Sequence, residues 1–121
     1  MKSPVEHVRV SAKSKEILIK IKRRTGLEHW NEICRIALCR SLANPTPTPK
    51  LDKNSDSSID MDWKTFAGTS SDFLSAAIYL RAKYDKVDYL NRDIIIDYFR
   101  SHLERGISGL QQLHNIAELF R

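Results

Sequence analysis

The sequence predicts a mainly α-helical protein, a helical bundle that begins with one short strand. Apolar residues recur at helical spacing over residues 12–25 and 29–43, and again through the C-terminal half of the 121-residue chain. Glycine or proline follows several of these segments, as expected where helices end. Polar and apolar side chains alternate through HVRVSA, residues 7–12, and this period of two indicates the strand. Because a single strand is not stable alone, we expect it to need a partner, which a second chain could supply.

The first helix should span residues 12–25, with Ser11 or Ser14 as its N-cap and Gly26 just past its end. At 100° per residue Ile17, Leu18, Ile21 and Thr25 fall within one arc of about 100°. Lys13, Lys20 and Arg24 line one flank of that arc, Lys15 and Lys22 line the other, and Arg23 lies on the outer face. The solvent side of this helix is therefore positive along nearly its whole length.

The second helix, residues 29–43, is apolar on most sides, and the Asn44-Pro45 pair ends it. A helix of this kind is normally buried on most sides, so we expect another subunit to cover part of it. Arg35 lies off the main apolar face and should pair with a carboxylate or an interface carbonyl. Trp30 and Trp63 are interpreted as packing residues.

Residues 44–62, NPTPTPKLDKNSDSSIDMD, are predicted to be an extended linker or long loop. It is either a tolerated surface insertion or a segment that orders on binding. The C-terminal half is predicted to form helices over 70–85, capped by Ser70 or Ser71, over 90–104, capped by Asn91, and over 107–120. A break is expected at Gly106, with Arg105 near the helix end. The three segments 1–43, 44–62 and 63–121 are predicted to form one domain.

The excess positive charge is concentrated at one end of the chain. The first 40 residues carry ten Lys/Arg and four Glu, a net charge of +6, whereas the remaining 81 carry ten basic and eleven acidic residues, a net charge of −1. Charge gathered in one segment produces a local field that can bind a polyanion. The sequence has neither an apolar run of transmembrane length nor a secretory signal core, and we expect a cytoplasmic protein that does not insert into membranes.

Several motifs together resemble one family. The segment RTGLEHWNEICRIALCRSL, residues 24–42, follows the basic helix and precedes a proline-rich break, and HLERGISGL, residues 102–110, closes the helical half. Their order and spacing resemble the DndE family, the small accessory subunits of bacterial DNA phosphorothioation systems. The similarity covers nearly the whole chain. The chain departs from the family pattern mainly in its long Ser/Asp-rich linker, which affects loop contacts more than helix contacts.

The resemblance implies a strand-helix-helix start like that of ribbon-helix-helix DNA binders. It also implies a homotetramer that binds double-stranded DNA, nicked DNA in particular, through surface lysines. The implied protein partners are the other modification subunits: a cysteine desulfurase, an iron–sulfur sulfurtransferase and an ATPase.

The basic segment supplies the candidate DNA-binding side chains. Lysine is a hydrated point charge suited to phosphate, so we expect backbone contacts with little sequence preference. Because the cations lie on two flanks, two or three per subunit could contact one duplex, or roughly 8–12 in a tetramer. The candidate DNA-binding residues are Arg9, Lys13, Lys15, Lys20, Lys22, Arg23 and Arg24.

No cofactor, metal site or catalytic residue is predicted. Cys34 and Cys39 diverge by about 140° on a helix, too far apart for one metal or a disulfide, and both are interpreted as core residues. The four histidines lack ligand or triad spacing. The predicted function is a non-catalytic DNA-binding accessory subunit of a phosphorothioation complex. Two alternatives stay open: a ribbon-helix-helix transcription regulator, in which His7, Arg9 and Ser11 read bases, and a protein-docking subunit that does not bind DNA.

Overall fold

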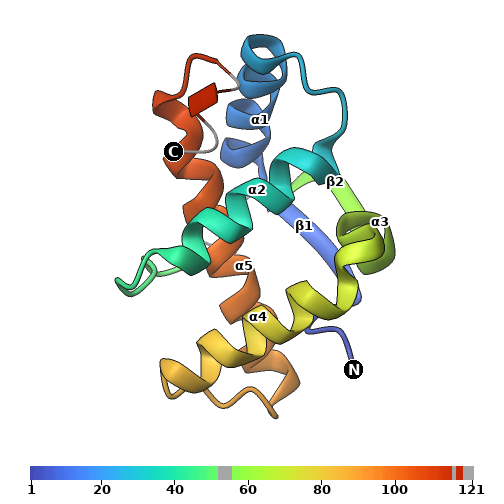
Figure 1. Ribbon diagram of the computed structural model, residues 1–121, viewed down its shortest axis with the longest axis vertical. Coiled ribbons are helices and arrows are strands. Elements are labelled where there is room, and N and C mark those ends of the chain that lie inside the picture. Colours follow the sequence, from blue (N-terminus) through green and yellow to red (C-terminus); the bar gives the residue numbers. More distant parts are fainter. Residues whose placement is uncertain (52–55, 116, 119–121) are drawn as a thin grey trace.

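The computed structural model describes residues 1–51, 56–115 and 117–118, and it is mainly α-helical (Figure 1). The element order confirms the predicted fold class, a helical protein with a strand-helix-helix start. β1 (His7–Ser11) leads directly into α1 (Ala12–Thr25), and α2 (Trp30–Ala43) follows after a short turn. The Ser11 Oγ accepts a hydrogen bond from the Ser14 backbone N–H at 3.1 Å, and Gly26 ends α1 with a φ of 76°. Both predicted boundaries of the basic helix are therefore confirmed.

The partner of β1 comes from the same chain. β2 (Asp56–Asp62) pairs antiparallel with β1, with Arg9 opposite Asp60 and His7 opposite Asp62. The expectation of a partner strand from a second chain was therefore wrong for this pairing, and so was the assignment of 56–62 to a structureless linker. Ile59 and Met61 turn inward while Asp60 and Asp62 turn outward, an alternation of period two that is present in the sequence DSSIDMD.

Two further elements differ from the sequence prediction. A short helix that was not predicted, α3 (Trp63–Ala67), follows β2 directly, capped by Asp62, whose Oδ1 accepts from the Thr65 backbone N–H at 2.7 Å. A 3-10 turn, η1 (Gly68–Ser70), then leads into α4 (Ser71–Tyr84), close to the predicted 70–85. The N-cap residue of α4, Ser70, makes no side-chain capping bond, and Ser71 Oγ accepts from the indole N–H of Trp63 at 2.9 Å.

The last long helix does not stop at Gly106. α5 (Arg92–Gly109) begins at the predicted cap Asn91, continues through Gly106, and is followed by the 3-10 turn η2 (Leu110–Gln112). The predicted helix over 107–120 was wrong, since Leu113 is already extended, and Phe120 lies outside the described residues. Gly106 is needed for packing instead: a Cβ there would lie 1.9 Å from the carbonyl oxygen of Ala37 on α2.

The crossing of α2 and α5 is the most extensive contact between two elements, and the core is built around it (Figure 1). α2 buries Ile33, Cys34, Ala37 and Leu38 against the rest of this chain rather than against a second subunit. Trp63 packs in an aromatic cluster with Phe66 and Phe99, as predicted for a packing residue. Among the described residues, no helix combines the length and apolar character needed to cross a bilayer.

Two arginines fix the C-terminal end of α2. Arg105 Nη2 donates to the Ser41 carbonyl at 2.7 Å, and Arg81 Nη1 donates to the Leu42 carbonyl at 2.8 Å. Both side chains also reach the backbone carbonyls of the proline-rich segment that follows, including that of Thr46. Arg105 therefore caps α2 from the side rather than ending its own helix, which corrects the sequence interpretation. The last carbonyls of a helix need such donors.

Candidate nucleic-acid interface

The apolar side of α1 packs into the core and turns its cations outward. Ile17, Leu18 and Ile21 are buried, so side chains on the opposite arc must face solvent. Lys22, Arg23 and Arg24 lie in the last turn, where the negative end of the helix dipole favours positive charge. The prediction of an amphipathic helix with a positive outer side is therefore confirmed for α1.

Four of the seven candidate cations already have partners within the chain. Lys15 Nζ donates to Ser58 Oγ at 2.6 Å, and Lys22 Nζ lies 4.3 Å from the centre of the Trp30 ring. Arg24 Nη1 donates to the carbonyls of Gln111 and Leu113, and Arg9 Nε lies 3.3 Å from a carboxylate oxygen of Asp60. These contacts hold the four side chains close to the protein and reduce what they offer to a ligand.

The other three candidates have no such contact. Lys13, Lys20 and Arg23 are exposed, and within the described part of the chain their charged groups make no hydrogen bond or ion pair. On the helix, Lys13 and Lys20 lie on one flank, two turns apart, and Arg23 lies one turn beyond Lys20. This set, Lys13, Lys20 and Arg23, is called the α1 cation row below.

The structure adds one cation that sequence reasoning missed. A cleft of about 270 Å³ lies between the start of α1, the proline-rich segment and α5, and both Lys13 and Lys50 line it. Ser101 and Ser108 line the same cleft, together with Glu104, whose carboxylate accepts from Ser14 Oγ at 3.0 Å. Lys50 lies 37 residues from Lys13 in a segment without periodicity, so no local pattern could have predicted that both residues line one cleft.

The exposed face of the strand pair is less suited to DNA. The carboxylate of Asp60 lies 3.4 Å from His7 Nδ1 and 3.3 Å from Arg9 Nε, so it faces both of the predicted base-reading side chains. Ser11, the third predicted reader, is buried and caps α1. Acidic side chains beside Arg9 would repel phosphate, which disfavours a ribbon that enters the major groove.

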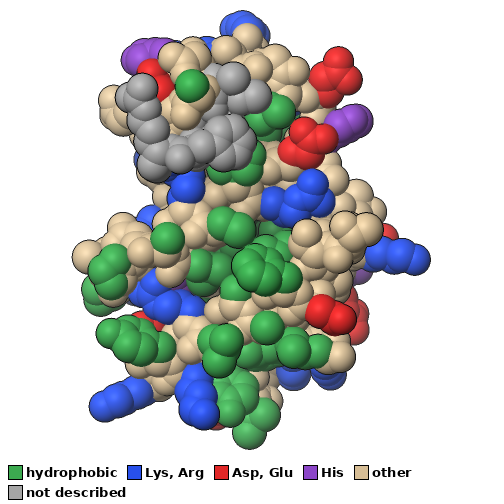
Figure 2. Space-filling view, viewed as in Figure 1, with side chains coloured by type: hydrophobic (Ala, Val, Ile, Leu, Met, Phe, Trp, Pro, Cys, Tyr) green, Lys and Arg blue, Asp and Glu red, His purple; other side chains and the backbone are tan. Residues whose placement is uncertain are grey.

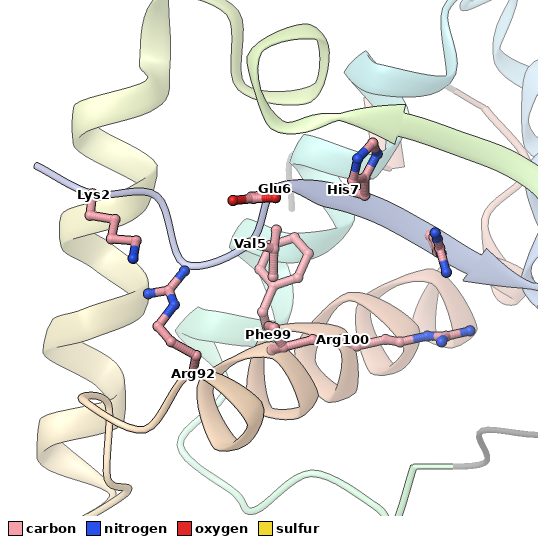
Figure 3. A pocket seen from close by; sticks show the side chains of 9 residues that line it. Lys2, Val5, Glu6, His7, Arg92, Phe99 and Arg100 are labelled. Atoms are coloured by element: carbon pink, nitrogen blue, oxygen red, sulfur yellow. The ribbon is translucent and has the colours of Figure 1, made fainter.

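A larger hollow below β1 is lined by two arginines of α5 that already have partners within the chain. This cavity of about 440 Å³ lies between the N-terminal segment and α5, and Figure 3 shows Arg92 and Lys2 at one end with Arg100 extended along the helix. Arg92 Nη2 donates to the carbonyls of Ser3 and Pro4, at 2.7 and 2.9 Å. Arg100 pairs with Asp56, and this hydrogen bond holds the pKa of that carboxyl below its usual value. The two arginines therefore tie α5 to the N-terminal segment and to β2.

The two cysteines have different environments. Cys34 is buried, and burial, aided by the nearby carboxylate of Glu104, raises its pKa to about 12. Cys39 is exposed, so its assignment to the core was wrong, although partial desolvation still raises the pKa of its thiol. Both thiols are unpaired. Within the described residues, no group of three or more His, Cys, Asp or Glu side chains could hold a metal ion.

A buried histidine links α5 to the end of α2. Arg105 Nε donates to Ser41 Oγ at 2.8 Å, which directs the Ser41 proton toward His102 Nδ1, also at 2.8 Å. His102 is 1% exposed, and burial together with the charges of Arg105 and Arg81 lowers its pKa to about 4. The geometry thus favours neutral imidazole with its proton on Nε2.

This arrangement predicts a pH-dependent stability. The folded protein holds His102 neutral, while the unfolded chain takes up a proton below about 6.5, so stability is present above that pH and is lost as pH falls toward 4. Between pH 7 and pH 5 the free energy of unfolding should fall by about 2 kcal/mol. Urea unfolding at pH 7, 6 and 5 measures this change. The variant His102→Gln should be less stable at pH 7, and its free energy of unfolding should change less with pH. The control variant His29→Gln, at an exposed position, should keep the pH dependence of the wild type. An unchanged pH dependence in His102→Gln would contradict the assignment to His102.

Comparison with known proteins shows which family the sequence belongs to. The sequence matches the family described as "DNA sulphur modification protein DndE" over residues 7–118. The chain belongs to the DndE family. This confirms the resemblance seen in the sequence and makes the chain a member of a family of DNA sulphur modification proteins. No curated protein matches the sequence.

A solved DndE structure has the same fold. The crystal structure of DndE from Escherichia coli B7A, described as involved in DNA phosphorothioation modification, superposes with a TM-score of 0.67 and 22% sequence identity. The match covers 88% of this chain and 97% of that one. At this identity the likeness establishes the shared fold of the two DndE chains.

Proposed function

We propose that this DndE-family chain is a non-catalytic, DNA-binding accessory subunit of a bacterial phosphorothioation complex in the cytoplasm. It holds double-stranded DNA, nicked DNA in particular, by phosphate contacts while the partner subunits exchange a phosphate oxygen for sulfur. Those partners are a cysteine desulfurase, an iron–sulfur sulfurtransferase and an ATPase. The observation that carries the proposal is the α1 cation row, three exposed cations without partners among the described residues.

The chemistry of this row favours phosphate over bases. Lysine predominates, and Lys50 extends the row across the cleft toward the proline-rich segment. A compact ammonium group suits a phosphate oxygen, whereas reading bases requires planar donors aimed into a groove. In a homotetramer, which is part of the proposal, four copies of the row would give steep salt dependence.

The two alternative functions, a transcription regulator and a docking subunit, require different surfaces to be free. A ribbon-helix-helix regulator needs Arg9 and its neighbours free to enter the major groove, but Asp60 lies against them. A docking subunit that never binds DNA would use the α1 cation row on an acidic protein. A hidden nicking activity would overturn the non-catalytic role, and conversion of supercoiled plasmid to open circles by purified protein with a divalent metal would reveal it.

A salt-titrated gel shift tests the proposal directly. The purified protein is titrated onto intact, nicked and scrambled-sequence duplexes of equal length at several salt concentrations. We expect no sequence preference, tighter binding to the nicked duplex, and a log–log salt slope of about −0.9 per phosphate contacted. Sequence-selective binding would favour the regulator instead. Absence of binding at low salt would reject the DNA-holding role.

A further inference from the structure

The outer face of α4 is apolar although it faces solvent. Phe73, Leu80 and Tyr84 are 70%, 68% and 76% exposed. Spacings of seven and four residues place the three on one stripe along the helix. The opposite face of α4 buries Leu74 and Ile78 in the core, so this helix is apolar on both sides. Large apolar side chains that share an exposed stripe typically mark an interaction surface.

A groove lies beside this stripe. It has a volume of about 710 Å³, and Leu80 and Tyr79 of α4 face Tyr89 and Leu90 of the segment that leads into α5. Leu90 is 81% exposed, so the wall formed by this segment also presents a large apolar side chain to solvent, as Leu80 does on the α4 wall. Figure 2 shows apolar side chains gathered in the lower part of the molecule, where Figure 1 places α4. We call this surface the α4 groove.

The charged groups that line the α4 groove all have the same sign. Lys2, Lys83 and Arg92 line it, and no described acidic residue does. Arg92 is fixed by the carbonyls of Ser3 and Pro4, which places a stationary guanidinium at the rim. The ammonium groups of Lys2 and Lys83 make no ion pair with the rest of the described chain. The groove is therefore an apolar floor with a basic edge.

We propose that the α4 groove docks an amphipathic helix of a partner protein, with apolar residues against Leu80 and Leu90 and carboxylates against the basic edge. An amphipathic helix laid in a groove is a common mode of recognition, and opposite charge at the rim fixes its partner and register. A second copy of this chain fits less well, because a symmetric pairing would bring two sets of the same cations to one interface. The inference rests on the proposed membership of a multi-subunit complex, but it is independent of DNA binding, since α1 lies elsewhere on the molecule (Figure 1).

The test uses the full chain and the three proposed partner subunits from the same bacterium, each purified and titrated separately by calorimetry. We expect at least one subunit to bind the wild type, and Leu80→Glu to weaken that binding at least tenfold. Lys83→Glu should weaken it several-fold and reduce its salt dependence. Both positions are exposed, so circular dichroism and the melting temperature should match the wild type.

A matched control separates this surface from the DNA-binding one. Ile19→Glu introduces the same charge at an exposed apolar position on α1 and should weaken DNA binding in a gel shift while partner binding stays unchanged. Leu80→Glu should do the reverse. If DNA binding fails for every variant but partner binding still depends on Leu80, the DNA role is rejected and the docking surface stands.

Three results would overturn the docking proposal. The first is that no subunit binds the wild type. The second is that Leu80→Glu binds as tightly as the wild type. The third is that Leu80→Glu lowers the mass of the protein itself in analytical ultracentrifugation, which would assign the α4 groove to a second copy. Unchanged binding in Lys83→Glu would reject the acidic character of the partner.

Discussion

Replacing Gly106 with alanine should destabilise the fold by about 3 kcal/mol or more, because overpacking a tight contact costs this much or more when backbone must move. The added Cβ would lie 1.9 Å from the carbonyl oxygen and 2.4 Å from the carbonyl carbon of Ala37. Both are backbone atoms in the middle of α2, so neither can rotate away. The two helices would have to separate along the most extensive contact of the molecule.

Thermal and urea unfolding at pH 7 measure this effect, and we expect the melting temperature to fall by roughly 10 °C or more. Gly109→Ala is the matched control, three residues later on the same helix, where an added Cβ meets nothing within 4 Å. That variant should be neutral or slightly stabilising, since alanine favours helix over glycine. A Gly106→Ala protein that melts within about 2 °C of the wild type would show that the α2–α5 crossing is not tightly packed.

Neutralising the α1 cation row should cause the largest change in DNA binding. The triple variant Lys13→Gln, Lys20→Gln and Arg23→Gln removes from each subunit three charges that make no contact within the described part of the chain, all at exposed positions. We expect the affinity for any duplex to fall at least about tenfold. The magnitude of the log–log salt slope should fall by about 0.9 for every phosphate that the variant no longer neutralises. Gel shifts at several salt concentrations measure both quantities.

The controls use the cations that the structure holds in internal contacts. The double variant Lys15→Gln and Lys22→Gln removes charges bound to Ser58 and stacked on Trp30, and we expect a much smaller decrease in affinity. Arg9→Gln should likewise have little effect on random duplexes, because Asp60 already faces that guanidinium. If the affinity of the double variant fell as far as that of the triple variant, DNA would be held by the other flank of α1.

Local sequence patterns determined a large part of this fold. The position of α1 followed from its apolar arc, its serine cap and Gly26, all of which act over a few residues. The boundaries of α2 and α4 and the Asn91 cap of α5 followed for the same reason. The concentration of cations near the N-terminus likewise identified the candidate interface, because net charge is a property of the sequence itself.

Tertiary structure decided what depends on residues far apart in the chain. The sequence could not show that β2 pairs with β1 and brings Asp60 against Arg9, a contact across 51 positions. It could not show that Gly106 serves a helix crossing rather than a helix end, because glycine suits both roles and only the approach of Ala37 distinguishes them. Nor could it show which cations stay without a contact, since the partners of Lys15, Lys22 and Arg24 come from three other segments. Periodicity and capping are local and can be predicted from sequence, whereas charge pairing and close packing depend on where the folded chain brings distant residues together.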